Sequence, residues 1–278
     1  MYYYIVDPQK ISQREFERVQ NLLYSSLSEY RVAGEVVRVT GLRTIAQLVE
    51  NAFSRGVKTL VTVGNEDTLN DVINAVKGRD VTLGFIPIMK TEIGRILGIN
   101  DIPNGAKTIA MRRIAPLDLG TANQNYFVSR ITFGLDVFDE GGLFNYKLVQ
   151  NISKLPEITL KFSVDGEYQA ETKAIGGAVI NARETAHGII AHPNDGVLDI
   201  VFLPKLSSWQ ALKHRNEIVE GLWENIPGSS VVHAKKLEIS SPTGMAIKSY
   251  DRVIAKTPAL IEVVPNALKI IVGKERKF

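Results

Sequence analysis

The chain contains no cysteine, and this absence removes several kinds of chemistry at once. Disulfide frameworks, zinc sites built on thiolates and thiol nucleophiles are all excluded. No apolar run reaches the roughly 18–20 residues that span a bilayer, and the start, MYYYIVDP, lacks the basic segment and cleavage site of a signal peptide. We therefore expect a cytoplasmic protein, which would meet any lipid as a peripheral protein at the inner membrane surface.

An excess of charge of either sign is also lacking, because 33 Lys and Arg face 30 Asp and Glu. So small a surplus does not predict nucleic acid as a partner. The histidines show no spacing typical of a metal site: His187, His192, His214 and His233. The 278 residues exceed the roughly 100–200 of one domain, so we expect two domains. The oligomeric state stays open, with a homodimer among the alternatives.

The N-terminal part of the chain alternates short apolar segments with amphipathic helical ones, which is typical of parallel strands joined by crossover helices. A first helix is expected from an N-cap at Ser12, and a later one over 69–76. The expected strands cover 2–6, 35–40, 58–63 and 81–87. The pattern predicts a doubly wound open sheet, whose ligands lie beyond the carboxyl ends of its strands.

From about residue 125 the chain changes to alternating segments with few helices, which predict a β-sandwich or barrel. One helix is expected over 208–222. Its apolar residues are expected to be core: Trp209, Leu212, Ile218, Val219 and Leu222. We place the two domains at 1–122 and 123–278, and leave open whether the last strand, 267–272, returns to the N-terminal domain.

The most informative segment is 58–76, KTLVTVGNEDTLNDVINAV, in which a strand, a polar turn and a helix N-terminus follow one another. Main-chain N–H groups and the helix dipole favour an anion at such a point, and Thr68 could cap the helix or contact a phosphate. The same residues also suit a plain N-capping turn. Both interpretations stay open on the residues alone.

The segment VGNEDTLNDVINA resembles, in register, the VGGDGTLNEVING motif of the diacylglycerol kinase catalytic domain. Further segments that resemble the family follow in order: LGFIP (83–87), RILGI (95–99), LDLGTANQNYFV (117–128), FGLDVF (133–138), DGVLDIVFL (195–203) and VIAKTPALIEVVPNALKIIV (253–272). This resemblance spans nearly the whole chain. It implies the fold of diacylglycerol and NAD kinases: an N-terminal doubly wound, Rossmann-like α/β domain that binds nucleotide, followed by a C-terminal β-sandwich domain.

The resemblance also implies a kinase that transfers the γ-phosphoryl group of ATP to a lipid hydroxyl such as that of diacylglycerol, with Mg²⁺ and a carboxylate base. By position in the family's motifs, Asp251 is the expected base and Glu66 the second catalytic acid, while Asp195 and Asp199 are the expected metal ligands. The expected nucleotide contacts are Asp7, Thr40, Gly64, Asn65, Glu66, Asp67, Thr68, Lys90 and Thr91.

The chain departs from the family at both phosphate loops. The family's GGDGT reads GNEDT here, so Asn65 and Asp67 replace two glycines, and Asp67 adds a charge that repels a triphosphate. The second loop, PxGTxNDFAR in the family, reads PIMKTEIGR over 87–95. There Lys90 could meet a phosphate as a point charge, and Thr91 could cap the next helix.

Three hypotheses follow from this mixture of matches and departures. The first is an active lipid kinase. The second is a catalytically degenerate relative that binds nucleotide or lipid as a sensor or regulatory protein. The third keeps the fold but uses another phosphoryl acceptor, such as NAD or a sphingoid base, because a fold does not determine one function.

Overall fold

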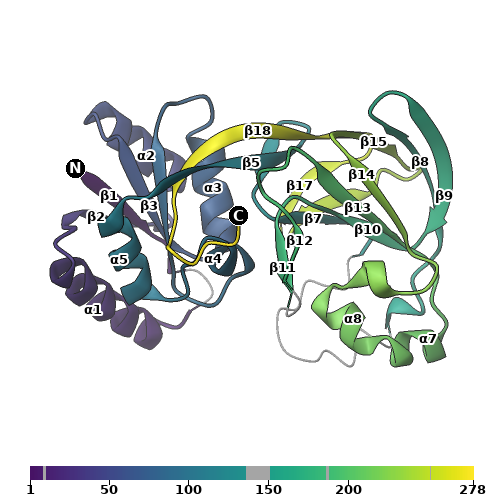
Figure 1. The fold of residues 1–278 in the computed structure, drawn as a ribbon, viewed down its shortest axis with the longest axis horizontal. Coiled ribbons are helices and arrows are strands. Elements are labelled where there is room, and N and C mark those ends of the chain that lie inside the picture. Colours follow the sequence, from purple (N-terminus) through teal and green to yellow (C-terminus); the bar gives the residue numbers. More distant parts are fainter. Residues whose placement is uncertain (9–10, 136–150, 186–187, 251) are drawn as a thin grey trace. The chain divides into compact units, whose positions relative to one another are not determined.

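The computed structural model describes residues 1–8, 11–135, 151–185, 188–250 and 252–278, which form two compact units (Figure 1). Unit 1 comprises Met1–Leu119, Ala182–Asp195 and Pro265–Phe278. Unit 2 comprises Gly120–Asn181 and Gly196–Val264. The structure therefore divides differently from a single cut after residue 122, because two segments from the second half of the chain belong to unit 1.

Unit 1 is built on a parallel sheet in the order β2-β1-β3-β4, and the end of β18 pairs parallel with β4. Its strands are β1 (Tyr2–Val6), β2 (Gly34–Arg38), β3 (Thr59–Gly64), β4 (Thr82–Pro87), most of β5 (Ile114–Ala122), the hairpin β11 (Arg183–Thr185) and β12 (Gly188–Ala191), and the end of β18 (Ala259–Ile271). Its helices are α1 (Gln13–Glu29), α2 (Ile45–Ser54), α3 (Glu66–Ala75), α4 (Glu92–Ile96) and α5 (Ile102–Met111).

Helices cover both faces of this sheet, as predicted for a doubly wound fold. On one face α1 and α5 bury Phe16, Leu23 and Ile109 against Val61 and Val63 of β3. On the other face α2 and α3 pack together, and α3 packs on β3 (Figure 1). Every residue of β3 is buried, which the nearly all-apolar run 58–63 predicted for a central strand.

The start of α1 confirms one prediction, and the start of α3 corrects another. Ser12 caps α1 and forms a capping box with Glu15. Helix α3, in contrast, begins at Glu66 rather than near residue 69, so the predicted polar turn is its first helical turn. The reason is local: Asn65 is a strong N-cap, and the acidic residues that follow it interact favourably with the helix dipole.

Unit 2 is a sandwich of two antiparallel sheets. One has the order β18-β15-β8-β9, and the other β14-β13-β10-β7-β16-β17. The strands of unit 2 are β6 (Asn125–Phe127), β7 (Arg130–Phe133), β8 (Ile158–Val164), β9 (Tyr168–Ala174), β10 (Gly176–Ile180), β13 (Leu198–Leu203), β14 (Ser230–Ala234), β15 (Lys236–Ser240), β16 (Ala246–Ser249) and β17 (Arg252–Lys256). The ring of Phe202 contacts those of Phe133 and Phe162 in the core between the sheets.

The helical segment of unit 2 is divided, where a single helix was predicted. It forms α7 (Ser208–Lys213) and α8 (Arg215–Glu220), followed by the 3₁₀ turn η2 (Trp223–Asn225). Ile218 is buried as predicted and Leu222 is partly buried. The core prediction is wrong for Trp209, Leu212 and Val219, which are exposed, because α7 buries Ala211 instead. None of the described helices has the length and apolar character needed to cross a membrane.

Candidate functional site

The carboxyl edge of the parallel sheet in unit 1 gathers most of the predicted site residues. Asp7 follows β1, and its N–H donates to Val63 O at 2.9 Å. The Thr68 hydroxyl lies 3.0 Å from Asp7 Oδ2 and 3.0 Å from Asn65 Oδ1. These three polar residues are buried. The structure therefore brings Asp7, Asn65 and Thr68 into one cluster.

The N-terminus of α3 is capped by the chain itself. Asn65 Oδ1 accepts a hydrogen bond from Thr68 N at 2.9 Å. Thr68 is thus a residue of the first turn rather than the cap. Gly64 makes room for it, because a Cβ at position 64 would lie 2.7 Å from Thr68 Oγ1. In this arrangement the missing side chain of Gly64 leaves space for Thr68 rather than for a ligand.

Glu66 and Asp67 are also buried, with 4% and 6% of their surfaces exposed. Glu66 Oε2 accepts a long hydrogen bond, 3.4 Å, from the N–H of Ile93 in the first turn of α4. A carboxylate is favoured there because the N-terminus of a helix carries partial positive charge. Glu66 therefore occupies a position at α4 that an anionic ligand would also prefer.

The second predicted phosphate loop ends in a helix cap. Thr91 Oγ1 accepts a hydrogen bond from Gly94 N at 3.0 Å, so the prediction that Thr91 caps the next helix is confirmed. Lys90, beside it, is exposed. Thr40 is exposed as well, and its Oγ1 accepts from Arg43 N at 3.1 Å, which closes the turn before α2.

The predicted acids of the C-terminal half belong to different parts of the structure. Asp195 is exposed at the end of a unit 1 segment. Asp199 belongs to β13 of unit 2, where its Oδ1 lies 2.5 Å from His233 Nδ1. Asp251, the predicted base, lies outside the described residues. Within the described ranges, the structure forms no group of three His, Asp or Glu side chains able to hold a metal ion.

Phosphate and Mg²⁺ fit these residues to different degrees. A phosphate at a helix N-terminus needs free N–H donors, but Thr68 N and Gly94 N donate to capping side chains and Ile93 N donates to Glu66. Mg²⁺ commonly takes one or two carboxylates and completes its shell with substrate phosphates and water. A single buried carboxylate such as Glu66 therefore meets the least that Mg²⁺ needs, whereas the N–H groups fit a phosphate only after Asn65 and Glu66 release them.

One charged residue near α4 escaped the sequence analysis. Arg183, on β11, is 2% exposed, and its Nε lies 3.9 Å from Oε1 of Glu92 on α4. A neighbouring pair, Arg95 and Glu184, is also 3.9 Å apart and joins the same two elements. The only signal in the sequence is an arginine that ends the apolar run AIGGAVINAR, and nothing local indicates that this run leads into unit 1.

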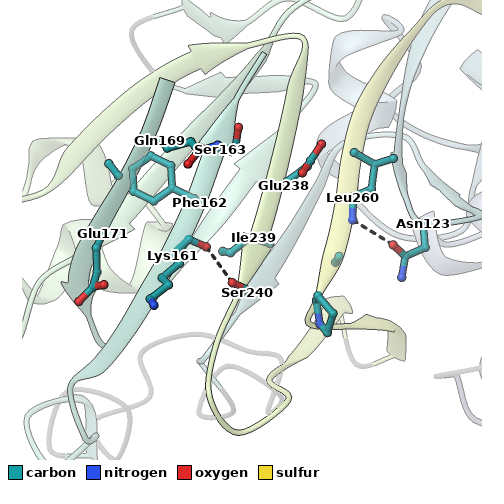
Figure 2. A pocket seen from close by; sticks show the side chains of 13 residues that line it. Asn123, Lys161, Phe162, Ser163, Gln169, Glu171, Glu238, Ile239, Ser240 and Leu260 are labelled. Carbon is teal, nitrogen blue, oxygen red and sulfur yellow. Dashed lines mark hydrogen bonds between the residues drawn. The ribbon is translucent and has the colours of Figure 1, made fainter. Parts of the chain in front are cut away.

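A hollow of about 730 Å³ lies elsewhere, in unit 2. Figure 2 shows its lining on β8, β9, β15 and the start of β18, with the side chains of Lys161, Glu171 and Glu238 among those that line it. Lys161 and Glu171 are cross-strand partners. The lining contains none of the predicted site residues, so this hollow is separate from the cluster in unit 1.

Comparison with known proteins identifies the family. The model of the YegS C-terminal NAD kinase beta sandwich-like domain matches residues 128–272, more than half of the chain. The chain belongs to this family. It is 28% identical over 204 residues to the "probable lipid kinase YegS-like" of Pseudomonas aeruginosa, covering 65% of this chain and 67% of that protein. It is 26% identical over 212 residues to the diacylglycerol kinase of Bacillus subtilis, covering 67% of each.

Solved structures confirm the predicted fold of this family member. A diacylglycerol kinase from Bacillus anthracis superposes with a TM-score of 0.77 at 20% identity, covering 98% of this chain and 97% of that one. An NAD kinase from Archaeoglobus fulgidus, solved in complex with ATP, superposes with a TM-score of 0.56 at 10% identity, covering 100% and 96%. The fold is therefore that of diacylglycerol and NAD kinases.

Proposed function

We propose that this chain is a lipid kinase that transfers the γ-phosphoryl group of ATP, with Mg²⁺, to the hydroxyl of a lipid alcohol such as diacylglycerol. Family membership and the relatives named lipid kinase and diacylglycerol kinase support the class of reaction. The observation in the structure that carries the proposal is the burial of two acids, Asp7 after β1 and Glu66 in the first turn of α3, at the carboxyl edge of the parallel sheet, which is where open α/β sheets bind ligands.

Buried acids suit a reaction in which charge neutralisation does most of the work. Buried carboxylates are costly unless hydrogen bonds or cations compensate them. In this proposal Glu66 would hold Mg²⁺, which would supply positive charge and help to neutralise a nucleotide's phosphates. Lys90 would meet a phosphate oxygen, and Asp251 is the proposed base that accepts the proton of the lipid hydroxyl.

A second function is favoured by the occupied helix N-termini. Asn65 holds Thr68 N, and Glu66 holds Ile93 N, so the chain's own side chains use the N–H groups that a phosphate would need. A relative that binds nucleotide or lipid without transferring phosphate would keep the fold but would lose the contacts between these N–H groups and a phosphate. The two functions differ in whether Mg²⁺ and ATP displace Asn65 and Glu66.

Phosphate transfer from γ-labelled ATP tests the proposal directly. The full chain is incubated with Mg²⁺ and mixed micelles of diacylglycerol, and in parallel with a sphingoid base or NAD as the acceptor. We expect labelled phosphatidic acid, which disappears in EDTA and in the variant Glu66→Ala. The matched control is Glu171→Ala, in the hollow of unit 2, which keeps the wild-type rate. A wild-type yield no higher than that of Glu66→Ala with every acceptor would refute transfer.

Calorimetry separates the second function from the first. Binding of ATP with Mg²⁺ tighter than about 1 mM, worth about 4 kcal/mol, together with an absence of product, would favour the non-transferring relative. Binding accompanied by product favours the kinase. Absence of both nucleotide binding and product would contradict both functions as far as they depend on a nucleotide.

A further inference from the structure

Helix α7 presents an apolar pair to solvent. Trp209 is 73% exposed and Leu212 is 43% exposed. The two residues are three apart, so they lie on the same side of the helix, whereas Ala211 faces inward and is fully buried. The chain's other tryptophan, Trp223, is only 3% exposed. An exposed tryptophan with an exposed leucine one helical turn away offers adjoining apolar surface on which another molecule can dock.

Three lysines lie on α7 or beside it. Lys205 precedes α7 and its Nζ donates to Leu155 O, and Lys213 ends α7. Ser208 Oγ lies 3.3 Å from Ser153 Oγ, which places the segment with Lys154 beside the helix. Among the described residues, no carboxylate forms an ion pair with any of these three ammonium groups. The nearby Glu217 pairs instead with His214, at 3.5 Å.

We propose that the α7 patch, defined as Trp209, Leu212, Lys154, Lys205 and Lys213, docks on the surface of an anionic lipid bilayer. Tryptophan prefers the boundary between headgroups and acyl chains, where its ring is in apolar surroundings and its N–H reaches polar groups. Lysines that lack carboxylate partners are attracted to lipid phosphates. Helices α7 and α8 lie together at one end of the unit 2 sandwich (Figure 1).

This inference rests on the proposed function for its purpose, because a lipid kinase must meet its acceptor at a membrane. Charge complementarity is what selects a bilayer over a protein as the occupant. A protein partner would have to place acids opposite three separate lysines, whereas an anionic bilayer provides negative charge everywhere around the inserted tryptophan.

Vesicle binding tests the patch without nucleotide, so its outcome is independent of catalysis. The full chain is mixed with vesicles of phosphatidylcholine alone, or of phosphatidylcholine with phosphatidylglycerol, and the bound fraction is measured by flotation. We expect binding to the anionic vesicles that weakens with salt, and a blue shift of tryptophan fluorescence on binding. Brominated lipid should quench the emission of the wild type, and the quenching should disappear in Trp209→Phe, which keeps only the buried Trp223.

Two variants and two matched controls measure each contribution. Trp209→Ala should lower the partition coefficient about tenfold, because it removes most of the buried apolar area. Lys213→Ala should lower it about fivefold, as expected for one lysine at an anionic surface. The controls lie on β9 of the same unit: Tyr168→Ala removes an aromatic residue that is 60% exposed, and Lys173→Ala removes an exposed lysine. Both should bind like the wild type.

Three outcomes would overturn the proposal: no binding to anionic vesicles, equal binding by Trp209→Ala and the wild type, or a chain that is dimeric in solution and becomes monomeric in Trp209→Ala. The last outcome would assign the patch to a second copy of the chain. Transfer to a short-chain, water-soluble diacylglycerol distinguishes the two proposals. If this transfer persists while the vesicle result is negative, the kinase stands and the docking surface falls.

Discussion

The hydroxyl of Thr68 lies 3.0 Å from Oδ2 of Asp7, and this contact joins the first turn of α3 to the end of β1 inside unit 1. Both side chains are 1% exposed. Because 61 residues separate them in sequence, the contact exists only once the parallel strands have assembled. It links two residues that the family resemblance assigned to the nucleotide site, and it makes that edge of the sheet part of the stable core.

Loss of this hydroxyl should destabilise the protein. We expect Thr68→Val to lower the free energy of unfolding by about 1–3 kcal/mol, because a buried carboxylate loses a hydrogen-bond donor. Urea denaturation measures the change. Thr62→Val, on the adjacent strand β3, is the matched control: the Thr62 hydroxyl is buried and finds no hydrogen-bond partner among the described residues, so its removal should be neutral or stabilising. Equal losses in both variants would contradict the interpretation.

Restoring the family's glycines should restore affinity for nucleotide. In Asn65→Gly/Asp67→Gly the cap that holds Thr68 N is gone and one carboxylate is removed from the first turn of α3. We expect ATP with Mg²⁺ to bind about tenfold more tightly by calorimetry, a gain of about 1.4 kcal/mol. Asn65→Ser, which keeps a capping oxygen, serves as the control and should bind like the wild type. An unchanged affinity in the double variant would show that these side chains do not obstruct the ligand.

The two arginine–glutamate pairs between β11 and α4 should differ greatly in importance. Arg183 is buried, so Arg183→Met removes a buried cation 3.9 Å from the largely buried Glu92 and should cost about 3–5 kcal/mol of stability. Arg95 is 52% exposed in its side chain, and Arg95→Met should cost less than about 1 kcal/mol. The pairs have the same length, 3.9 Å, but they differ in burial, and Glu184 also pairs with Lys277 at 3.5 Å. Similar midpoints in urea denaturation would contradict this ranking.

Alkaline pH should weaken the fold through Tyr4. Its hydroxyl donates to Val32 O at 2.5 Å, and burial, followed by the neighbouring Tyr2, raises the pKa of Tyr4 above its ordinary value of 10.0. In the unfolded chain Tyr4 ionises near that ordinary value, whereas the folded state keeps it neutral. The stability that this difference contributes is therefore complete below about pH 10 and is lost as the pH rises further.

Melting temperatures followed from about pH 8 to about pH 11 measure this effect. Tyr4→Phe should melt lower at pH 8, because the Val32 carbonyl loses its donor, but its melting temperature should fall less steeply above pH 10. Tyr168→Phe, at a position that is 60% exposed, is the control and should follow the wild-type curve. Parallel curves for Tyr4→Phe and the wild type would rule out Tyr4 as the source.

Several elements could be predicted because their causes are local. Strand β1 has the predicted bounds, and Ser12 and Thr91 cap helices as their side chains suggest. A side-chain oxygen within three residues of an unpaired N–H group needs no tertiary partner. The prediction for the start of α3 was wrong because Asn65 and Thr68 are both good caps. In the structure Thr68 contacts Asp7 and Gly64, and Asn65 is the cap.

The exposure of Trp209 shows where periodicity fails. Apolar spacing over 208–222 predicted one helix with one buried face, yet the helix breaks at His214 and each half buries a different residue, Ala211 in α7 and Ile218 in α8. A pattern of spacing specifies a face only while the helix remains straight. Where one helix ends and the next begins in a new direction, packing against the rest of unit 2 decides which side chains are buried.

By itself the sequence determined the doubly wound and β-sandwich patterns, the helix caps at Ser12 and Thr91, and the kinase family, because alternation, capping and motif order depend on residues close together in the chain. Tertiary structure alone decided that 182–195 and 265–278 belong to unit 1, that Arg183 lies against α4, and that Glu66 reaches the N-terminus of α4. Each of these features is a contact between segments far apart in the chain. Such contacts depend on which buried charges and apolar surfaces meet once the strands have paired, and neighbouring residues do not specify this.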